Sequence, residues 1–366
     1  MFASRGLRKI ASLIPPTVAR RTISLSACSY GIRSKWRAPL FRELYHRHKQ
    51  LEAKGKVPPN IRSEYIEWNY DSELFAFGKR LKEDFDESTL RQALTDISYI
   101  ESETRRQVAL GVETPALQVS SNCDLANAGK ALIEDYSLKY VRATHPLLPE
   151  EGVRTIVDYL TSEKVMSEIG LGIGLKDIIL TEEQPPSVAT LAKGFQAVIS
   201  AVNISSGINS CQKFIQDFVL TQLVGKDIYD IWQVHEPFKT LSEIMARSGV
   251  GLPEPRLVFQ SGQKTIEAVY QVALYSDKQF IGTGYGESTD VAVDQAASDA
   301  LRRLFHITAS SDPLPFGETS ENITISDKEN LSILEWSTIK AKNCCCVNVL
   351  DFLGKPINNL DVYIVL

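Results

Sequence analysis

Few residues in this chain have the types and spacing that catalysis or metal binding requires. The sequence has 366 residues, with six cysteines and five histidines. Cys344, Cys345 and Cys346 are consecutive and the other three cysteines are isolated, so none has the CxxC spacing of a zinc site. No Ser-His-Asp or Cys-His set for nucleophilic catalysis is visible. We therefore expect no catalytic residue, no metal and no cofactor.

Two glycine-rich stretches have some of the spacing of a phosphate-binding loop but lack its context. The stretch Gly170–Gly174 has no preceding strand and no βαβ unit, and Gly282–Gly286 is explained by a turn between a strand and a helix. We expect no nucleotide site at either stretch.

The residues best suited to bind nucleic acid lie near the N-terminus, in a basic arm over residues 31–65. Residues 33–62 hold nine Lys or Arg against Glu43 and Glu52, with Trp36, Phe41 and Tyr45 interleaved. Such cations neutralise phosphates, and aromatic rings stack on bases. A solvated helix or linker explains the pattern equally well. The candidate RNA contacts in this arm are Arg33, Lys35, Arg37, Arg42, Arg47 and Lys49.

The first 37 residues contain eight Arg or Lys and no Asp or Glu, although the whole chain carries a net charge of −5. An Arg-rich and Ser-rich amphipathic start without acids is typical of a mitochondrial transit peptide, so we expect one over residues 1–30 and a location in the mitochondrial matrix. The alternative is a disordered basic arm. Pro15 and Pro16 interrupt the apolar stretch, which argues against a secretory signal. No run of 18 apolar residues is present, so we expect no membrane span.

Residues 66–230 carry apolar residues at helical spacing. The sets fall in Leu74–Leu81, Leu90–Ile97, Val153–Leu160 and Phe214–Leu223, and the last is followed by Gly225, a residue that commonly ends helices. Several helices with short connections predict an all-α domain.

Residues 236–306 change to the order helix, three strands, helix. The first helix is expected around Thr240–Arg247, the strands at Arg256–Gln260, Ala268–Tyr275 and around Gln279–Gly282, and the last helix after an N-cap at Ser288. Gly284–Ser288 is expected to form the turn before that last helix. The remaining residues, 311–366, begin polar with Pro313 and Pro315 and end apolar without a clear period, and we expect this tail to be disordered.

Three stretches of the helical region resemble the ribonuclease III family. Leu90–Tyr99 resembles the pattern L-x-x-A-L-T-H-x-S-Y, with Asp96 in place of the histidine. Asn122–Lys130 resembles the signature N-E-R-L-E-F-L-G-D, matching it at Asn122, Leu125 and Gly129. Leu191–Ala201 resembles L-A-D-x-x-E-A-L-I-G-A. The resemblance implies an all-α ribonuclease III-like domain.

The acidic positions of that family fall here on residues that are not acidic. They are occupied by Ala126, Lys130, Lys193 and Gln196. The family hydrolyses RNA with Mg²⁺ ions, which prefer anionic oxygen ligands. Alanine supplies no ligand, glutamine supplies only a neutral carbonyl, and a lysine ammonium repels the ion. We therefore expect the domain to lack nuclease activity.

Residues 236–306 resemble a double-stranded-RNA-binding domain, through the glycine-rich turn and the alanine-rich last helix. Where that family places a lysine pair after the serine, this chain has Thr289 and Asp290. The region holds nine acids against seven bases, so we expect weak binding to free duplex RNA, which depends on phosphate neutralisation. Lys264, Arg302 and Arg303 remain candidate contacts, although a solvated helix end also explains the arginine pair.

The combination resembles the family of large-subunit mitochondrial ribosomal protein forty-four. That resemblance implies a multidomain, non-catalytic structural component of the mitochondrial large ribosomal subunit, which supports mitochondrial translation. The expected partners are large-subunit ribosomal RNA, neighbouring mitochondrial ribosomal proteins and another ribonuclease III-like protein. Two alternatives stay open at this stage, namely a mitochondrial double-stranded-RNA-processing ribonuclease and an accessory RNA-binding protein.

Overall fold

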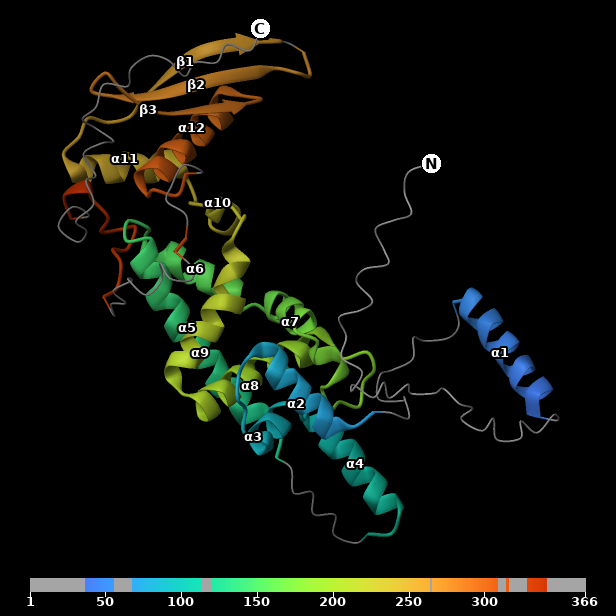
Figure 1. The fold of residues 1–366 in the computed structure, drawn as a ribbon. Coiled ribbons are helices and arrows are strands. Elements are labelled where there is room, and N and C mark those ends of the chain that lie inside the picture. The colour runs from blue at the N-terminus through green and yellow to red at the C-terminus, as the bar shows by residue number, and fades with distance from the viewer. Residues whose placement is uncertain are drawn as a thin grey trace, which may run out of the picture. The chain divides into compact units, whose positions relative to one another are not determined.

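A computed structural model of the chain describes residues 37–55, 68–112, 120–263, 265–308, 314–315 and 328–340 (Figure 1). The chain divides into two compact units, Met1–Tyr65 and Ile66–Leu366. The expected transit peptide lies outside the described residues, as does the part of the expected tail after residue 340. In the first unit, the described part is helix α1, Arg37–Ala53.

The second unit begins with a helical domain, residues 68–230. Its elements are α2 (Tyr70–Leu81), α3 (Glu87–Ala93), α4 (Ile97–Ala109), α5 (Cys123–Thr144), α6 (Glu150–Leu160), α7 (Glu163–Gly172), the 3-10 turn η2 (Leu175–Asp177), α8 (Val188–Ser206), α9 (Ile208–Phe218), η3 (Leu220–Leu223) and α10 (Ile228–Ile231). Side-chain caps begin several of these helices. Asn69 accepts a hydrogen bond from the amide of Asp71 at 3.1 Å, and Asp86 accepts one from Thr89 at 3.0 Å.

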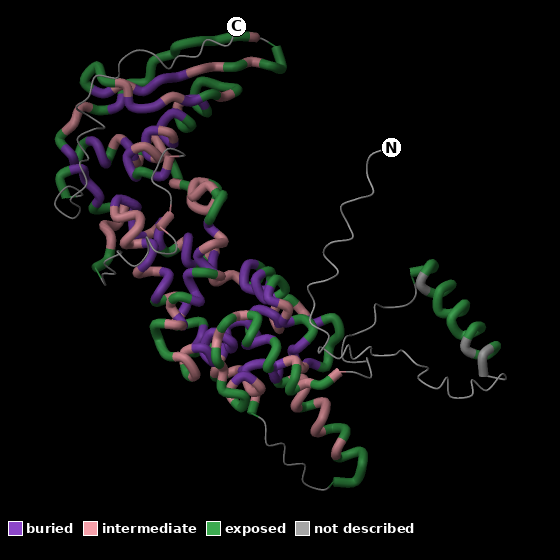
Figure 2. The backbone as a smooth tube through the Cα atoms, in the orientation of Figure 1, coloured by how far each residue is buried: buried purple, intermediate pink, exposed green. Residues whose placement is uncertain are grey.

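Helix α8 forms the centre of the helical domain, and eleven of its residues between Leu191 and Val202 are buried (Figure 2). It packs against α3, α5, α7 and α9. By length and composition α8 could cross a membrane, but 61% of its most apolar window is buried inside the protein. Such burial is what a core helix shows when its apolar residues face neighbouring helices on all sides.

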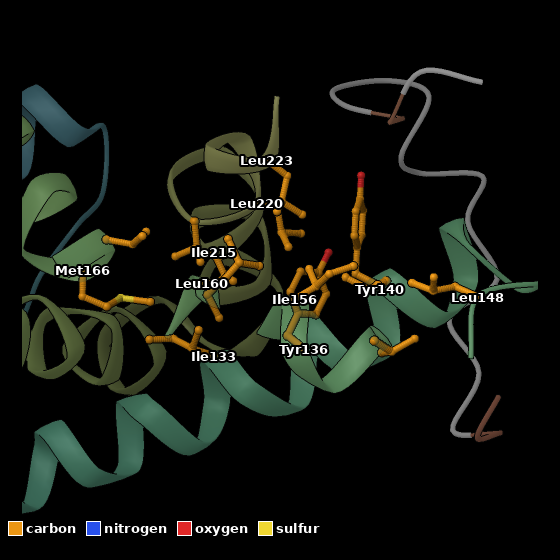
Figure 3. Packing of buried hydrophobic residues seen from close by; sticks show 14 of the residues in the cluster. Ile133, Tyr136, Tyr140, Leu148, Ile156, Leu160, Met166, Ile215, Leu220 and Leu223 are labelled. Atoms are coloured by element: carbon orange, nitrogen blue, oxygen red, sulfur yellow. The ribbon is translucent and has the colours of Figure 1, made fainter. Parts of the chain in front are cut away.

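The hydrophobic core follows from this central position. Figure 3 shows Ile133, Tyr136 and Tyr140 of α5 turned toward Ile156 and Leu160 of α6, with residues of α9 and η3 behind them. Tyr140 is 1% exposed, and its hydroxyl donates a hydrogen bond to the carbonyl oxygen of Pro315 at 2.6 Å. Burial raises the pKa of Tyr140 to about 12, so the phenol remains a donor at physiological pH.

The second part of this unit is an α/β domain, residues 236–308. It contains α11 (Pro237–Ser248), the strands β1 (Glu254–Ser261), β2 (Val269–Ser276) and β3 (Gln279–Gly286), and α12 (Thr289–Leu304). The strands form an antiparallel sheet in the order β1-β2-β3, and α12 packs on one face of it (Figure 1). The fold class is therefore confirmed: an all-α domain precedes an α-β-β-β-α domain.

The glycines before α12 differ from the sequence expectation. We expected Gly284–Ser288 to be a turn, but Gly284, Tyr285 and Gly286 continue strand β3, and the bend falls at Glu287 and Ser288. The physical reason is the close approach of helix and sheet. A Cβ atom at Gly284 would lie 2.1 Å from the backbone nitrogen of Ala296 on α12. Ser288 caps α12 as expected, accepting a hydrogen bond from the amide of Val291 at 3.3 Å.

The tail expectation was wrong for residues 328–340. Trp336 is 1% exposed, and its indole nitrogen donates a hydrogen bond to the carbonyl oxygen of Leu147 at 3.0 Å. The sequence pattern showed no period because this segment is neither helix nor strand over most of its length, and it is held by individual side chains. Disorder does not describe this part of the tail.

Replacing Gly284 with alanine should destabilise the α/β domain, because the added methyl group meets the backbone of α12 rather than a flexible side chain. We expect a loss on the order of 1–3 kcal/mol in the free energy of unfolding, measured by chemical denaturation. Gly172→Ala is the matched control, since nothing lies within 4 Å of a Cβ built there. Equal stability of the two variants would contradict this account.

Candidate functional site

The four positions that correspond to acids in the ribonuclease III resemblance lie where α5 crosses α8. Ala126 and Lys130 are one turn apart on α5, and Lys193 and Gln196 are one turn apart on α8. Gly129 permits the crossing, because a Cβ atom there would lie 1.9 Å from the backbone oxygen of Gln196. The fold thus brings these parts of α5 and α8 together.

Ala126 lies inside an apolar cluster. It is 4% exposed and packs with Ala93 of α3 and with Ala197 and Ala201 of α8. Partly buried Phe85 packs against the same cluster. Small side chains therefore fill this position and let three helices approach closely. Sequence reasoning missed the role of these alanines, whose only signal is their four-residue spacing on α8.

The other three positions carry no anionic oxygen either. The Lys130 ammonium lies 3.7 Å from a carboxylate oxygen of Glu134, one turn along α5. Lys193 is exposed to solvent, and Gln196 is 9% exposed. Within the described part of the chain, no group of three His, Cys, Asp or Glu side chains could hold a metal ion. The crossing therefore presents two cations and two neutral side chains.

The motif residues around the crossing make structural contacts. Asp96, in the position of the family's histidine, caps α4 by accepting hydrogen bonds from the amide and hydroxyl of Ser98, at 3.1 and 2.7 Å. Asn122 is fully buried, and its backbone amide donates a hydrogen bond to the backbone carbonyl of Thr95 at 3.0 Å. Thr95 also pairs with Leu180 in an isolated parallel bridge. These bonds join the start of α4, the start of α5 and the loop before α8.

Among the candidate RNA contacts, those on α1 are the most available. Arg42, Arg47 and Lys49 are exposed there, and the guanidinium of Arg47 lies 3.8 Å from a carboxylate oxygen of Glu43. Tyr45, between them, is 64% exposed. Arg37 begins the helix, but its side chain lies outside the described residues, together with Arg33, Lys35 and Lys264.

The arginine pair of α12 is engaged within the fold. Arg302 makes an ion pair with Asp227 at 2.5 Å and lies over the ring of Tyr229. Arg303 makes an ion pair with Asp299 at 3.0 Å and lies over the ring of Phe280. Each guanidinium therefore has a carboxylate partner within the chain that offsets part of its charge, and contact of this pair with RNA stays a prediction.

The start of α12 is acidic rather than basic. Thr289 and Asp290 are exposed in its first turn, and Asp294 is exposed one turn later. Carboxylates in these positions repel phosphate oxygens, so this end of the domain does not favour duplex RNA.

Comparison with known proteins identifies the family. Residues 69–202 match the family described as large ribosomal subunit protein mL44, endonuclease domain, and residues 232–337 match the MRPL44 dsRNA-binding domain. The chain is 32% identical to large ribosomal subunit protein mL44 of Caenorhabditis elegans over 341 residues, which cover 90% of this chain and 82% of that protein. The chain belongs to the mL44 family. The resemblance to ribosomal protein forty-four is thereby confirmed.

Proteins named ribonuclease 3 are also similar to this chain. The mL44-family chain is 26% identical to ribonuclease 3 of Symbiobacterium thermophilum, over 60% of this chain and 89% of that protein. A solved structure of the ribonuclease III nuclease domain from Campylobacter jejuni aligns with 41% of this chain and 97% of its own, at 18% identity and a TM-score of 0.34. That score is too low to support an argument about detail.

Ala126→Glu should destabilise the helical domain instead of restoring a metal ligand. The carboxylate would replace a methyl group in the alanine cluster, where its immediate neighbours are apolar side chains. We expect a loss of at least about 2 kcal/mol in the free energy of unfolding, measured by chemical denaturation. Asn127→Glu, at the neighbouring exposed position of α5, is the control and should leave stability nearly unchanged.

Proposed function

We propose that this chain is a non-catalytic structural component of the large subunit of the mitochondrial ribosome. The similarity to an mL44 protein over 90% of the chain carries this proposal, because it covers both domains and not the nuclease-like part alone. The match of residues 232–337 to the family's RNA-binding domain supports it further.

The chemistry of the α5–α8 crossing supports the absence of catalysis. We infer that Ala126, Lys130, Lys193 and Gln196 occupy the positions of the family's metal-binding carboxylates. Packing among Ala93, Ala197 and Ala201 uses the space at Ala126, and the ammonium of Lys130 lies 3.7 Å from a carboxylate oxygen of Glu134. Divalent ions that activate water require several anionic oxygens, which these four side chains do not supply.

We propose that α1 supplies contacts to ribosomal RNA. Arg42 and Lys49 are seven residues apart, or about two helical turns, so they lie on one face of the helix, with Tyr45 between them. Leu40, Leu44 and Leu51 lie along a different face and are about half exposed. A cationic face with an aromatic ring suits phosphates and bases, and the apolar stripe suits a protein neighbour.

The charge of two segments supports the proposed location and the proposed protein partners. The basic, acid-free first 37 residues support import into the mitochondrial matrix. The acidic α/β domain is better suited to protein neighbours than to RNA, since its carboxylates repel phosphates. We include a second ribonuclease III-like protein among the proposed neighbours of the helical domain.

The ribosomal role predicts that tagged full-length protein from mitochondrial lysate cosediments with the large ribosomal subunit in a sucrose gradient. Arg42→Glu combined with Lys49→Glu should lower the bound share severalfold at low salt, and the difference from wild type should shrink as salt rises, because salt screens the phosphate contacts that the variant lacks. Arg42→Lys combined with Lys49→Arg is the matched control and should retain binding. Slowly sedimenting wild-type protein beside intact ribosomes would overturn the proposal. Unchanged binding of the charge-reversed variant would overturn only the role of α1.

The purified full chain should not cleave duplex RNA when Mg²⁺ is added, beyond the rate in EDTA. A labelled duplex followed on a denaturing gel measures this. Cleavage that requires Mg²⁺ and disappears when Lys130 and Lys193 are changed to alanine would contradict the absence of catalysis. Cleavage that persists unchanged in that variant would arise from another site or a contaminant.

A further inference from the structure

Residues 328–340, here called the strap, contact both domains of the second unit. In the sequence the strap follows the α/β domain, yet it returns to the helical domain, which precedes the α/β domain. The α/β domain is therefore attached to the helical domain at both of its ends, through the connection around Trp232 and through the strap.

The strap binds the helical domain at the corner between α5 and α6. The side-chain amide of Asn330 donates hydrogen bonds to the carbonyls of His145 and Leu148, at 3.0 and 2.9 Å. Glu151 accepts hydrogen bonds from the hydroxyl of Ser332 at 2.6 Å and from the amide of Ile333 at 3.0 Å. The two bonds from Asn330 satisfy backbone carbonyls in the turn that follows the end of α5.

Glu150, beside this corner, is a buried carboxylate with several partners. It accepts hydrogen bonds from the guanidinium groups of Arg142 at 2.5 Å and Arg154 at 3.2 Å, and from the backbone amide of Asn330 at 3.2 Å. Burial alone would raise the pKa of Glu150, but the hydrogen bonds from Arg142 and Arg154, the charge of Arg142 and the backbone hydrogen bond from Asn330 together outweigh burial and lower it. The carboxylate therefore stays ionised while it holds the strap.

The strap binds the α/β domain at the end of α11. One guanidinium nitrogen of Arg247 donates to three strap carbonyls, those of Ile333 at 3.0 Å, Leu334 at 2.5 Å and Trp336 at 3.3 Å. The amide of Thr338 donates to the hydroxyl of Ser248 at 3.1 Å. A charged donor shared among carbonyls fixes the path of a segment that has no regular backbone pairing.

An aromatic row joins the two attachments. The ring of Phe305, at the end of α12, lies between Trp232, at a centroid distance of 6.0 Å, and Trp336, at 5.3 Å. Trp232 also packs on the helical domain, since a Cβ atom at Gly152 of α6 would lie 3.0 Å from its ring. Trp336 donates to Leu147 on that domain while its ring packs on Phe305 of the other.

We propose that the strap is an interdomain lock that holds the helical and α/β domains in one fixed orientation. A single linker between domains ordinarily permits relative rotation. Here a second attachment with buried polar and aromatic contacts removes that freedom, and Trp336 is its central residue. The proposal does not depend on the ribosomal role, since every contact that carries it lies within this chain.

Single-molecule energy transfer in the full chain tests the lock. Dyes are placed through non-natural amino acids at the exposed positions Lys176 of the helical domain and Lys278 of the α/β domain. Wild-type protein should give one narrow efficiency distribution. Trp336→Ala should broaden it or shift it, while circular dichroism shows both domains still folded. Leu334→Ala is the matched control on the same segment, because that side chain is 74% exposed, and it should behave as wild type.

A second variant decides the matter if Trp336→Ala unfolds. Arg247→Gln removes the donor to the three strap carbonyls and leaves the aromatic row in place, with Arg256→Gln, an exposed arginine of β1, as its control. The expected result is again a broader distribution for Arg247→Gln alone. A broad wild-type distribution, or an unchanged narrow one in whichever of the two strap variants is folded, would overturn the proposal.

Discussion

The helical domain depends on the close crossing of α5 and α8 at Gly129. No side chain other than hydrogen fits there, because a Cβ atom would collide with the backbone oxygen of Gln196. The crossing puts α8 in the middle of the helical domain, where neighbouring helices bury most of its residues. It also decides which positions of the two helices face each other, and so what chemistry the domain could support.

At that crossing, the helices are held by the packing of small apolar side chains. Alanines from α3, α5 and α8 meet around Ala126, and their small size maintains the close helix spacing that Gly129 permits. A carboxylate at this point would require a compensating cation, and a methyl group requires none. The helices therefore keep their close packing without a metal ion to offset the charge of a buried carboxylate. The same holds for Asp96 and Asn122, which now serve as a helix cap and a buried connection.

The α/β domain shows a related change. Its sheet and α12 still approach closely at Gly284, so the fold is intact, but the first turn of α12 carries an exposed aspartate. Arg302 and Arg303 are paired with carboxylates of the same chain. Both domains thus use charged and small residues to stabilise the protein itself, which suits a chain whose role in a large assembly is to hold a defined shape.

The sequence by itself determined most element types and the family, because these depend on residue identity at regular spacing. Helical periodicity over Leu74–Leu81 and the β-branched run of β2 are local signals that survive in the folded chain. Only the tertiary structure decided that Gly284 belongs to a strand, that Arg302 is paired with Asp227, and that Trp336 is buried between two domains. The physical reason is distance along the chain: Trp336 meets a carbonyl 189 residues away and Arg302 meets a carboxylate 75 residues away. Such contacts leave no period in the sequence, so the tail looked featureless until its partners were in place.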